Sequence, residues 1–262
     1  MTTLLHADLT YHLFGLCFRV HNGLKGGHKE EVYEEALIGL LDQEKVDYVP
    51  QPRYLVFYKG RQVGEYYPDL VFADGKVVAD LKAAAQIAPL HKAQVLSYVG
   101  VTQAELGLIL NFGGTSFQSE RLPNYLQNRK PLEPNLTLPE GLLYPELTAR
   151  VLSILYTVHH ELGPGFLHQV YRRATRIELE LQKINFIYLK DLPLRFEGVP
   201  LRSSPTRLYL IEEKLLLATI AVPTIAAQHS ERMRWAMQET QTKLGLIANF
   251  YPSRLDLRFL RV

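Results

Sequence analysis

The residues best suited to chemistry are carboxylates and a lysine within apolar stretches of the first half of the chain. Asp80 and Lys82 are two residues apart, and Asp69 belongs to the preceding apolar stretch. Side chains two apart in a strand point to one face, and a buried charge is costly unless it is paired or binds a metal ion. Carboxylates from adjacent strands offer the oxygen ligands that Mg²⁺ and Mn²⁺ prefer. These residues predict a divalent-cation site, to which Glu30 could add a third carboxylate.

A cation held there would polarise a bound phosphate and lower the pKa of a bound water molecule, which Lys82 could position. The segment that follows adds polar groups on one helical face. Gln94 and Tyr98 are four residues apart, and His91 precedes Gln94 by three, so the three side chains share that face. We expect them to orient the lysine, the water molecule or the phosphate.

The apolar periodicity predicts the elements that position these residues. Helices are expected over Leu9–Asn22, Glu30–Glu44 and Pro89–Val99. Strands are expected over Tyr54–Tyr58, Val63–Phe72, Lys76–Lys82, Leu106–Phe112 and Phe117–Leu122, the last at an edge. Lys59-Gly60 and Asp74-Gly75 are typical of hairpin turns. The pattern predicts an α/β fold with a mixed central sheet flanked by helices.

The chain repeats itself without a gap at an offset of 138 residues. Val32-Tyr33 aligns with Val170-Tyr171, and Leu106-Gly107-Leu108-Ile109 aligns with Leu244-Gly245-Leu246-Ile247. The matches gather at glycines, aromatic residues and apolar runs, which fix the backbone and the core. We therefore predict an internal pseudo-dimer of two tandem domains, residues 1–124 and residues 141–262. A proline-rich linker is expected over residues 125–140.

The first copy resembles the PD-(D/E)XK nuclease superfamily and, within it, the GxxExxY family. The resemblance covers nearly all of residues 5–122 and rests on Asp69, Asp80-Leu81-Lys82, Gln94-x-x-x-Tyr98 and Gly27-His28-Lys29-Glu30-Glu31-Val32-Tyr33. It implies a Mg²⁺-dependent (or Mn²⁺-dependent) nuclease that acts on DNA or RNA phosphodiesters. Glu30, Asp69 and Asp80 would bind the metal ion. Lys82 would be the catalytic lysine, with Gln94 and Tyr98 as its supporting pair.

The sequence departs from the GxxExxY pattern at Asp80, where that family usually has Glu. The shorter arm would shift the metal ion. The second copy departs at every proposed site position, with His168 for Glu30, Arg207 for Asp69, Ala218 for Asp80, Ile220 for Lys82, Arg232 for Gln94 and Ala236 for Tyr98. Without carboxylates it has no Mg²⁺ site, and we expect it to be catalytically inert.

Arginines in the second copy offer a different chemistry. Arg207 and Arg232 could hold a phosphate bidentately, with Arg172, Arg173 or Arg234 nearby in the sequence. Residues 125–262 hold 18 basic and 13 acidic residues, a net charge of +5, against −3 for residues 1–124, which hold 11 and 14. A basic half favours contact with phosphate. Neutral drift of an abandoned site is the competing interpretation.

Composition limits the class of protein. With 47% hydrophobic and 21% charged residues, the chain is typical of globular proteins. No apolar run approaches the ~20 residues that span a bilayer, and the first ten residues lack a signal-peptide pattern. The single cysteine, Cys17, excludes an internal disulfide and a multi-cysteine metal site. These features predict no membrane association and a cytoplasmic location.

Two other functions fit the same sequence. The fold could serve as a non-catalytic module that binds nucleic acid or protein, with Asp80 marking an early step in the loss of activity. It could instead be a structural partner, as a pseudo-dimer or a homo-oligomer, in a larger complex. Binding of Mg²⁺ or Mn²⁺ to the first copy separates the nuclease from the module.

Overall fold

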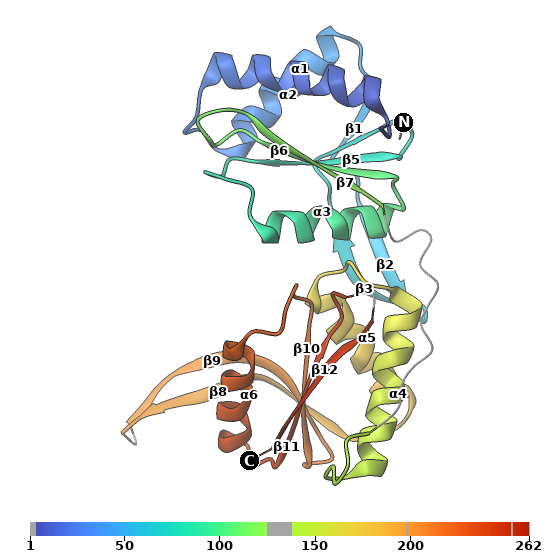
Figure 1. Cartoon of the computed structure of the whole chain (residues 1–262), viewed down its shortest axis with the longest axis vertical. Helices are drawn as coiled ribbons and strands as arrows, with labels where there is room; N and C mark the ends of the chain where they lie inside the picture. The colour runs from blue at the N-terminus through green and yellow to red at the C-terminus, as the bar shows by residue number, and fades with distance from the viewer. Residues whose placement is uncertain (1–3, 125–137, 198, 253, 262) are drawn as a thin grey trace. The chain divides into compact units, whose positions relative to one another are not determined.

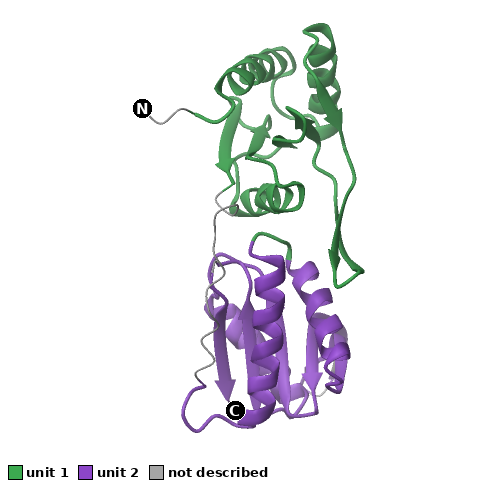
Figure 2. Cartoon of the chain, turned by 90° about the vertical axis from the view of Figure 1, so that its right-hand side faces the viewer, with its two compact units in different colours: residues 1–129, 165–167 green, residues 130–164, 168–262 purple. Residues whose placement is uncertain are grey.

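The computed structural model describes residues 4–124, 138–197, 199–252 and 254–261. The chain divides into two compact units, residues 1–129 with 165–167 and residues 130–164 with 168–262 (Figure 2). The linker predicted over residues 125–140 lies outside the described residues, except for its last three positions. Within the described ranges, no helix has the length and apolarity needed to cross a membrane.

The first unit is built around a mixed sheet. Its helices are α1 (Ala7–Leu24), α2 (Glu30–Gln43) and α3 (Pro89–Thr102) (Figure 1). Its strands are β1 (Tyr48–Pro50), β2 (Tyr54–Tyr58), β3 (Arg61–Tyr66), β4 (Leu70–Phe72), β5 (Val77–Lys82), β6 (Leu106–Asn111) and β7 (Gln118–Pro123). The sheet has the order β1-β4-β5-β6-β7, and β2 pairs with β3 in a separate hairpin. β5 and β6 are parallel in register, and the other neighbours are antiparallel.

Helices cover both faces of this sheet. α1 and α2 lie on one face and α3 on the other (Figure 1). The alternation of side chains in β5 sends Ala79 and Leu81 into the core beneath α1 and α2. The same alternation turns Asp80 and Lys82 to the α3 face. The sequence prediction that these two side chains share a face is therefore confirmed, because β5 is a regular strand.

The single strand predicted over Val63–Phe72 is wrong. β3 ends at Tyr66 and β4 begins at Leu70, so the segment between them leaves the ladder. Pro68 explains the break, because proline has no backbone N–H to donate to a neighbouring strand. Asp69 consequently lies in a bend and not within a strand. The short strand β1 was not predicted.

The second unit repeats the architecture with longer strands. Its helices are α4 (Pro145–Leu162), α5 (His168–Leu181) and α6 (Ala227–Glu239). Its strands are β8 (Phe186–Phe196), β9 (Val199–Ile211), β10 (Leu215–Ile220), β11 (Leu244–Asn249) and β12 (Asp256–Arg261), in the sheet order β12-β11-β10-β9-β8. At the offset of 138, β9 covers the positions of β3 and β4 in one continuous strand. The break at Pro68 is replaced by Thr206, and Arg207 adopts a positive φ of 55° within the strand.

Matched residues make matched contacts in the two units. Tyr33 stacks on Phe112 with ring centroids 5.0 Å apart, and Tyr171 stacks on Phe250 at 4.5 Å. β10 and β11 are parallel, as β5 and β6 are. The prediction of two tandem α/β copies, each with a mixed sheet flanked by helices, is confirmed by this shared topology.

Candidate active site

The candidate site begins with two charged side chains inside β5. All six residues of this strand are buried, and Asp80 and Lys82 are 1% and 8% exposed. β5 lies between β4 and β6 in the sheet, and it pairs with β6 along its whole length. Removing a carboxylate and an ammonium from water costs several kcal/mol unless each finds a partner. The site must therefore supply partners for both groups.

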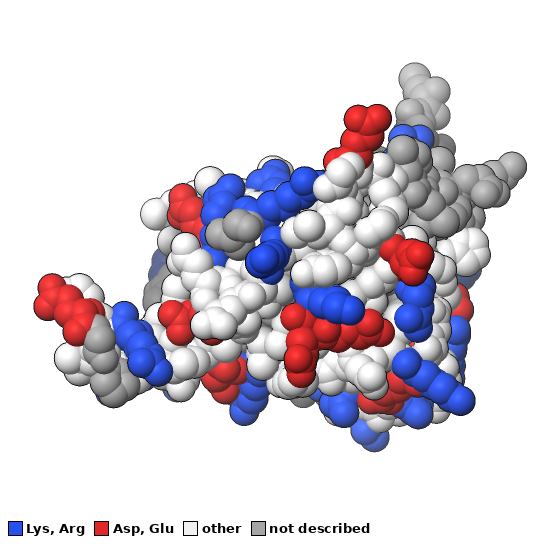
Figure 3. Space-filling model, turned by 90° about the horizontal axis from the view of Figure 1, so that it is seen from below, with Lys and Arg blue, Asp and Glu red and all other residues white. Residues whose placement is uncertain are grey.

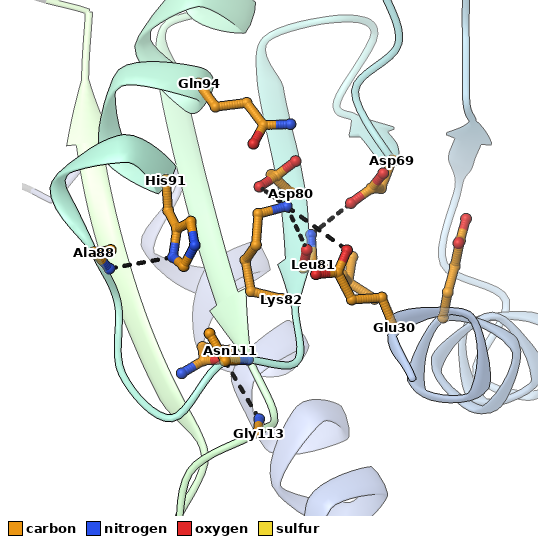
Figure 4. Close-up of polar contacts among 12 residues, drawn as sticks. Glu30, Asp69, Asp80, Leu81, Lys82, Ala88, His91, Gln94, Asn111 and Gly113 are labelled. Atoms are coloured by element: carbon orange, nitrogen blue, oxygen red, sulfur yellow. Dashed lines mark hydrogen bonds and ion pairs between the residues drawn. The ribbon is translucent and has the colours of Figure 1, made fainter. Parts of the chain in front are cut away.

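Lys82 reaches two carboxylates and a carbonyl. Its Nζ lies 2.5 Å from Asp80 Oδ2 and 3.8 Å from Glu30 Oε2. It donates a hydrogen bond to the Leu81 carbonyl at 2.8 Å. Figure 4 shows Nζ between the Glu30 and Asp80 side chains, which come from α2 and β5. One amine thus draws two acidic side chains from different elements to the same place.

Asp80 remains incompletely satisfied despite this ion pair. Both of its carboxylate oxygens are buried, and neither accepts a hydrogen bond of good geometry from the described residues. Nearly all buried polar atoms in folded proteins have such a partner. A hard cation that prefers carboxylate oxygens would satisfy them. The donor set around Asp80 therefore fits a divalent metal ion.

Asp69 is fixed by a backbone contact. Its Oδ2 accepts a hydrogen bond of 2.6 Å from the Leu81 amide. The ladder between β4 and β5 ends at Leu70 and Ala79, so this amide has no partner from β4. The carboxylate takes the place of the missing strand and holds the bend against β5 (Figure 4). The Pro68 break thereby gives Asp69 its position near Asp80.

The two carboxyl groups resist ionisation. Burial raises the pKa of Asp80 to about 7, the Lys82 ammonium opposes the rise, and the Asp69 carboxylate adds to it. Burial also raises the pKa of Asp69 to about 6, against the hydrogen bond from Leu81 and the charge of Lys82. A bound cation favours the ionised form of nearby carboxylates. Both groups would therefore gain from a positive charge beyond that of Lys82.

Gln94 and Tyr98 contact each other on α3, as their spacing of four residues predicts. Gln94 Nε2 donates a hydrogen bond of 2.8 Å to the Tyr98 hydroxyl. The Gln94 side chain extends from α3 toward Asp80 (Figure 4). Burial, together with the Asp80 and Asp69 charges, raises the pKa of Tyr98. The pair forms a polar wall on the α3 side of the site.

The three predicted carboxylates do not form a ready three-ligand group. Among the described residues, no three His, Cys, Asp or Glu side chains are grouped so that they could hold a metal ion. Glu30 pairs with Lys82, and one oxygen of Asp69 is engaged by Leu81. The structure therefore brings Glu30, Asp69 and Asp80 around the Leu81-Lys82 segment, with Lys82 occupying the position between two of them.

His91 has a structural role that the sequence did not reveal. Its Nδ1 accepts a hydrogen bond of 3.2 Å from the Ala88 amide at the start of α3. In the second unit His229 accepts the equivalent bond from Ala226 at 3.0 Å, although no carboxylate site exists there. A contact that survives where the site is lost serves the fold. His91 thus caps α3 and does not orient the lysine through Nδ1.

Glu34 was overlooked as a neighbour of the site. It lies one turn after Glu30 on α2, and its charge contributes to the raised pKa of Asp69. Its Oε1 also accepts a hydrogen bond of 2.9 Å from Gln51. The spacing of four residues from Glu30 was the available signal.

The equivalent place in the second unit is apolar. Ala218 and Ile220 stand where Asp80 and Lys82 would be, and they pack against the cluster that includes Met233 and Met237 of α6. Arg207 is exposed on β9, and Arg232 donates a hydrogen bond to the Pro205 carbonyl of the same strand. No carboxylate occupies any aligned site position of the second copy, and its lack of catalytic activity stays a prediction.

Both halves of the chain match the same family model. It is described as the PD-(D/E)XK nuclease superfamily, and it matches residues 7–122 and again residues 145–262. A comparison with curated proteins gave no match. The second match covers the copy that lacks the carboxylates, so it does not depend on them.

Proposed function

This chain belongs to the PD-(D/E)XK nuclease superfamily, and on that premise we propose that its first unit is a metal-dependent nuclease of nucleic-acid phosphodiesters. The observation that carries the proposal is Asp80, a buried carboxylate whose Oδ2 lies 2.5 Å from a buried lysine and whose Oδ1 has no hydrogen-bond partner among the described residues. A scaffold that had lost catalysis would gain nothing from keeping these charges out of water. Their retention favours a role that a cation completes.

The finer assignment is to the GxxExxY family. It is supported by the loop before α2, where Gly27 adopts a φ of 104° that favours glycine. Tyr33 holds this loop by donating a hydrogen bond of 2.7 Å to the Lys25 carbonyl. The loop sets the start of α2, where Glu30 faces Lys82. Glycine and tyrosine of this motif therefore position an acidic side chain of the site.

Asp80 and Asp69 would hold the metal ion, and Glu30 would join them from the rim. Mg²⁺ and Mn²⁺ fit this oxygen donor set. When bound, the ion would polarise the phosphate and lower the pKa of a coordinated water molecule. Lys82 Nζ would donate a hydrogen bond to that water or to the phosphate. Gln94, oriented by Tyr98, would position the same groups from α3.

The second unit would take no part in catalysis. Ala218 and Ile220 provide neither ligands nor an amine, and they belong to a packed apolar cluster. A chain with one such site would cut one strand of a duplex per encounter. The product expected from a supercoiled plasmid is therefore the nicked circle, which appears before any linear form.

The test is a plasmid-nicking assay with Mg²⁺ or Mn²⁺. Wild type should nick, and Asp80→Ala and Lys82→Ala should lose at least about a hundredfold in rate. Asp74→Asn is the matched control, because Asp74 is exposed in the β4–β5 turn and asparagine tolerates its positive φ. Equal nicking by wild type and Asp80→Ala would show that a contaminant or another site acts.

A non-catalytic binding module is the second candidate. The observation that favours it is the pairing of Lys82 with both Asp80 and Glu30, without a ready three-ligand group. Calorimetric titration of the full chain with Mn²⁺ separates the candidates. Heat of binding that disappears in Asp80→Asn supports the nuclease, and the absence of binding to wild type supports the module. Light scattering would report whether copies of the chain associate.

A further inference from the structure

The second unit reverses the charge of the first at its abandoned site. At the offset of 138, Glu30, Glu34 and Asp69 align with His168, Arg172 and Arg207. In the first unit Gln51 links two of these acidic residues, because its side chain donates a hydrogen bond to Glu34 and its amide donates one to the Asp69 carbonyl. Glu30 lies 3.8 Å from Lys82, next to Leu81, whose amide binds the Asp69 side chain. Loss of a metal site by drift would remove acidic groups without replacing each one by a base. The substitutions therefore call for a ligand of opposite charge.

The three basic groups are near one another in the folded unit. His168 begins α5, Arg172 follows one turn later, and Arg207 comes from β9. α5 is held to β9 here, because the Tyr209 hydroxyl donates a hydrogen bond of 2.8 Å to the Arg172 carbonyl. Partial burial, and then the charges of Arg172 and Arg207, lower the pKa of His168. The three side chains therefore share one electrostatic environment.

Arg172 has no carboxylate partner within the part of the chain that the structure describes. It is only partly exposed, and burial, together with the nearby Arg207 and Arg173 charges, lowers the pKa of its guanidinium. None of His168, Arg172 and Arg207 forms an ion pair with a carboxylate among the described residues. Positive groups held together without a counter-charge repel one another and lose solvation. A bound anion would remove both costs.

The surroundings favour phosphate over a metal ion. Two guanidinium groups offer planar donor pairs that match phosphate oxygens. On the face drawn in Figure 3, basic and acidic side chains are interspersed. That face therefore offers no broad basic surface.

We infer that His168, Arg172 and Arg207 of the second unit form a binding site for a backbone phosphate of nucleic acid, at the position where the first unit has its acidic cluster. The choice of nucleic acid as the source of the phosphate rests on the proposed function. The site itself does not depend on cleavage by the first unit. It would hold the substrate while the first unit acts on it.

The test measures binding without cleavage. Fluorescence anisotropy of a labelled oligonucleotide, single-stranded or duplex, is recorded with the full chain in EDTA. Arg172→Gln with Arg207→Asn should weaken binding on the order of tenfold and reduce the salt slope by about 2. Glutamine suits a helix, and asparagine tolerates the positive φ at position 207. If the double variant folds poorly, Arg207→Asn alone is measured in its place. This change is at an exposed position and should give part of the loss in affinity.

Arg150→Gln is the control for net charge. Arg150 lies on α4 and pairs with Glu212 at 3.8 Å, so its loss should leave affinity within about twofold. Inorganic phosphate, compared with chloride at equal ionic strength, should displace the oligonucleotide from wild type more strongly than from the double variant. Circular dichroism confirms that each variant is folded.

Several results would overturn this inference. Unchanged affinity of the folded double variant, or an equal loss in Arg150→Gln, would show that the cluster is not the site. Direct binding of inorganic phosphate to wild type, lost in the double variant and without any binding of the oligonucleotide, would assign the site to a free phosphate. Arginine-dependent binding by a chain that never nicks DNA would leave this inference intact and overturn only the proposed function.

Discussion

Lys82 Nζ lies 2.5 Å from Asp80 Oδ2 within a strand whose six residues are all buried. An apolar pair of similar volume would be as stable there or more stable, because desolvation of two charges offsets their attraction. The pair nevertheless leaves both oxygens of Asp80 without hydrogen bonds of good geometry. The site is therefore built at the expense of stability, and its energetics are open to measurement.

Asp80→Asn should stabilise the metal-free protein at high pH. The pKa of Asp80 is raised to about 7 in the folded protein, against ~3.9 in an unfolded chain. A carboxyl group whose pKa is higher in the folded state stabilises that state fully when the pH is below the unfolded-state pKa. This contribution is lost as the pH rises through the folded-state pKa. Wild type should thus lose stability between about pH 4 and pH 7, and Asp80→Asn should lose less.

The expected gain at pH 8 is ~1–3 kcal/mol, since one pKa unit corresponds to ~1.4 kcal/mol and asparagine also changes local hydrogen bonding. Thermal melts in EDTA at pH 4, 6 and 8 measure it. The difference between the two proteins should vanish near pH 4. A difference in stability that is the same at all three pH values would mean that burial does not raise the pKa of Asp80.

A divalent cation should stabilise wild type through the first unit. Because Asp80 and Asp69 gain from added positive charge, Mn²⁺ at a hundred times its dissociation constant would contribute ~2.7 kcal/mol. Melts at pH 8 with and without Mn²⁺ should show a rise in the midpoint for wild type and none for Asp80→Asn. An equal rise in both proteins would place the ion elsewhere.

The alternation of residues in a strand was sufficient to predict half of this site. Asp80 and Lys82 share a face because a strand repeats every two residues, and Gln94 meets Tyr98 because a helix brings residues four apart together. These relationships are local. Repetition at an offset of 138 residues likewise predicts the duplication from the sequence alone.

Relationships between distant segments could not be predicted. The hydrogen bond from Leu81 to Asp69 depends on a break in the ladder at Pro68, which a continuous apolar pattern over Val63–Phe72 concealed. Lys82 lies closer to Asp80 than to Glu30 because of how α2 packs on the sheet, and residue spacing does not predict this packing. His91 looked functional because its role as a helix cap depends on the backbone at Ala88.

Lys82→Met should destabilise the protein in a pH-dependent way. Methionine keeps the length of the stem but removes the charge that opposes the raised pKa of Asp80. Breaking a buried pair in this way typically costs ~3–5 kcal/mol while the remaining group stays ionised. The loss should be clear at pH 8 and small at pH 5, where Asp80 can protonate.

The double variant Asp80→Asn with Lys82→Met should recover most of that loss at pH 8. The cycle of two single variants and the double variant isolates the coupling energy of the pair. Additive effects at both pH values would show that Lys82 and Asp80 do not interact, against their 2.5 Å separation.

The matched glycines of the two copies should respond differently to alanine. A Cβ at Gly107 would lie 2.4 Å from Val95 Cγ1 and 2.8 Å from Val99 Cγ2, so α3 could not pack so closely on β6. Gly107→Ala should cost ~1–3 kcal/mol by overpacking. At Gly245 the nearest atom is Met237 Sδ at 2.6 Å, and flexible methionine can move aside at lower cost.

Gly39→Ala on α2, with no atom within 4 Å of the new Cβ, should instead stabilise the protein by ~0.5–1 kcal/mol. Denaturant unfolding of the three variants gives the order, and a loss at Gly245 equal to that at Gly107 would refute the argument from side-chain flexibility.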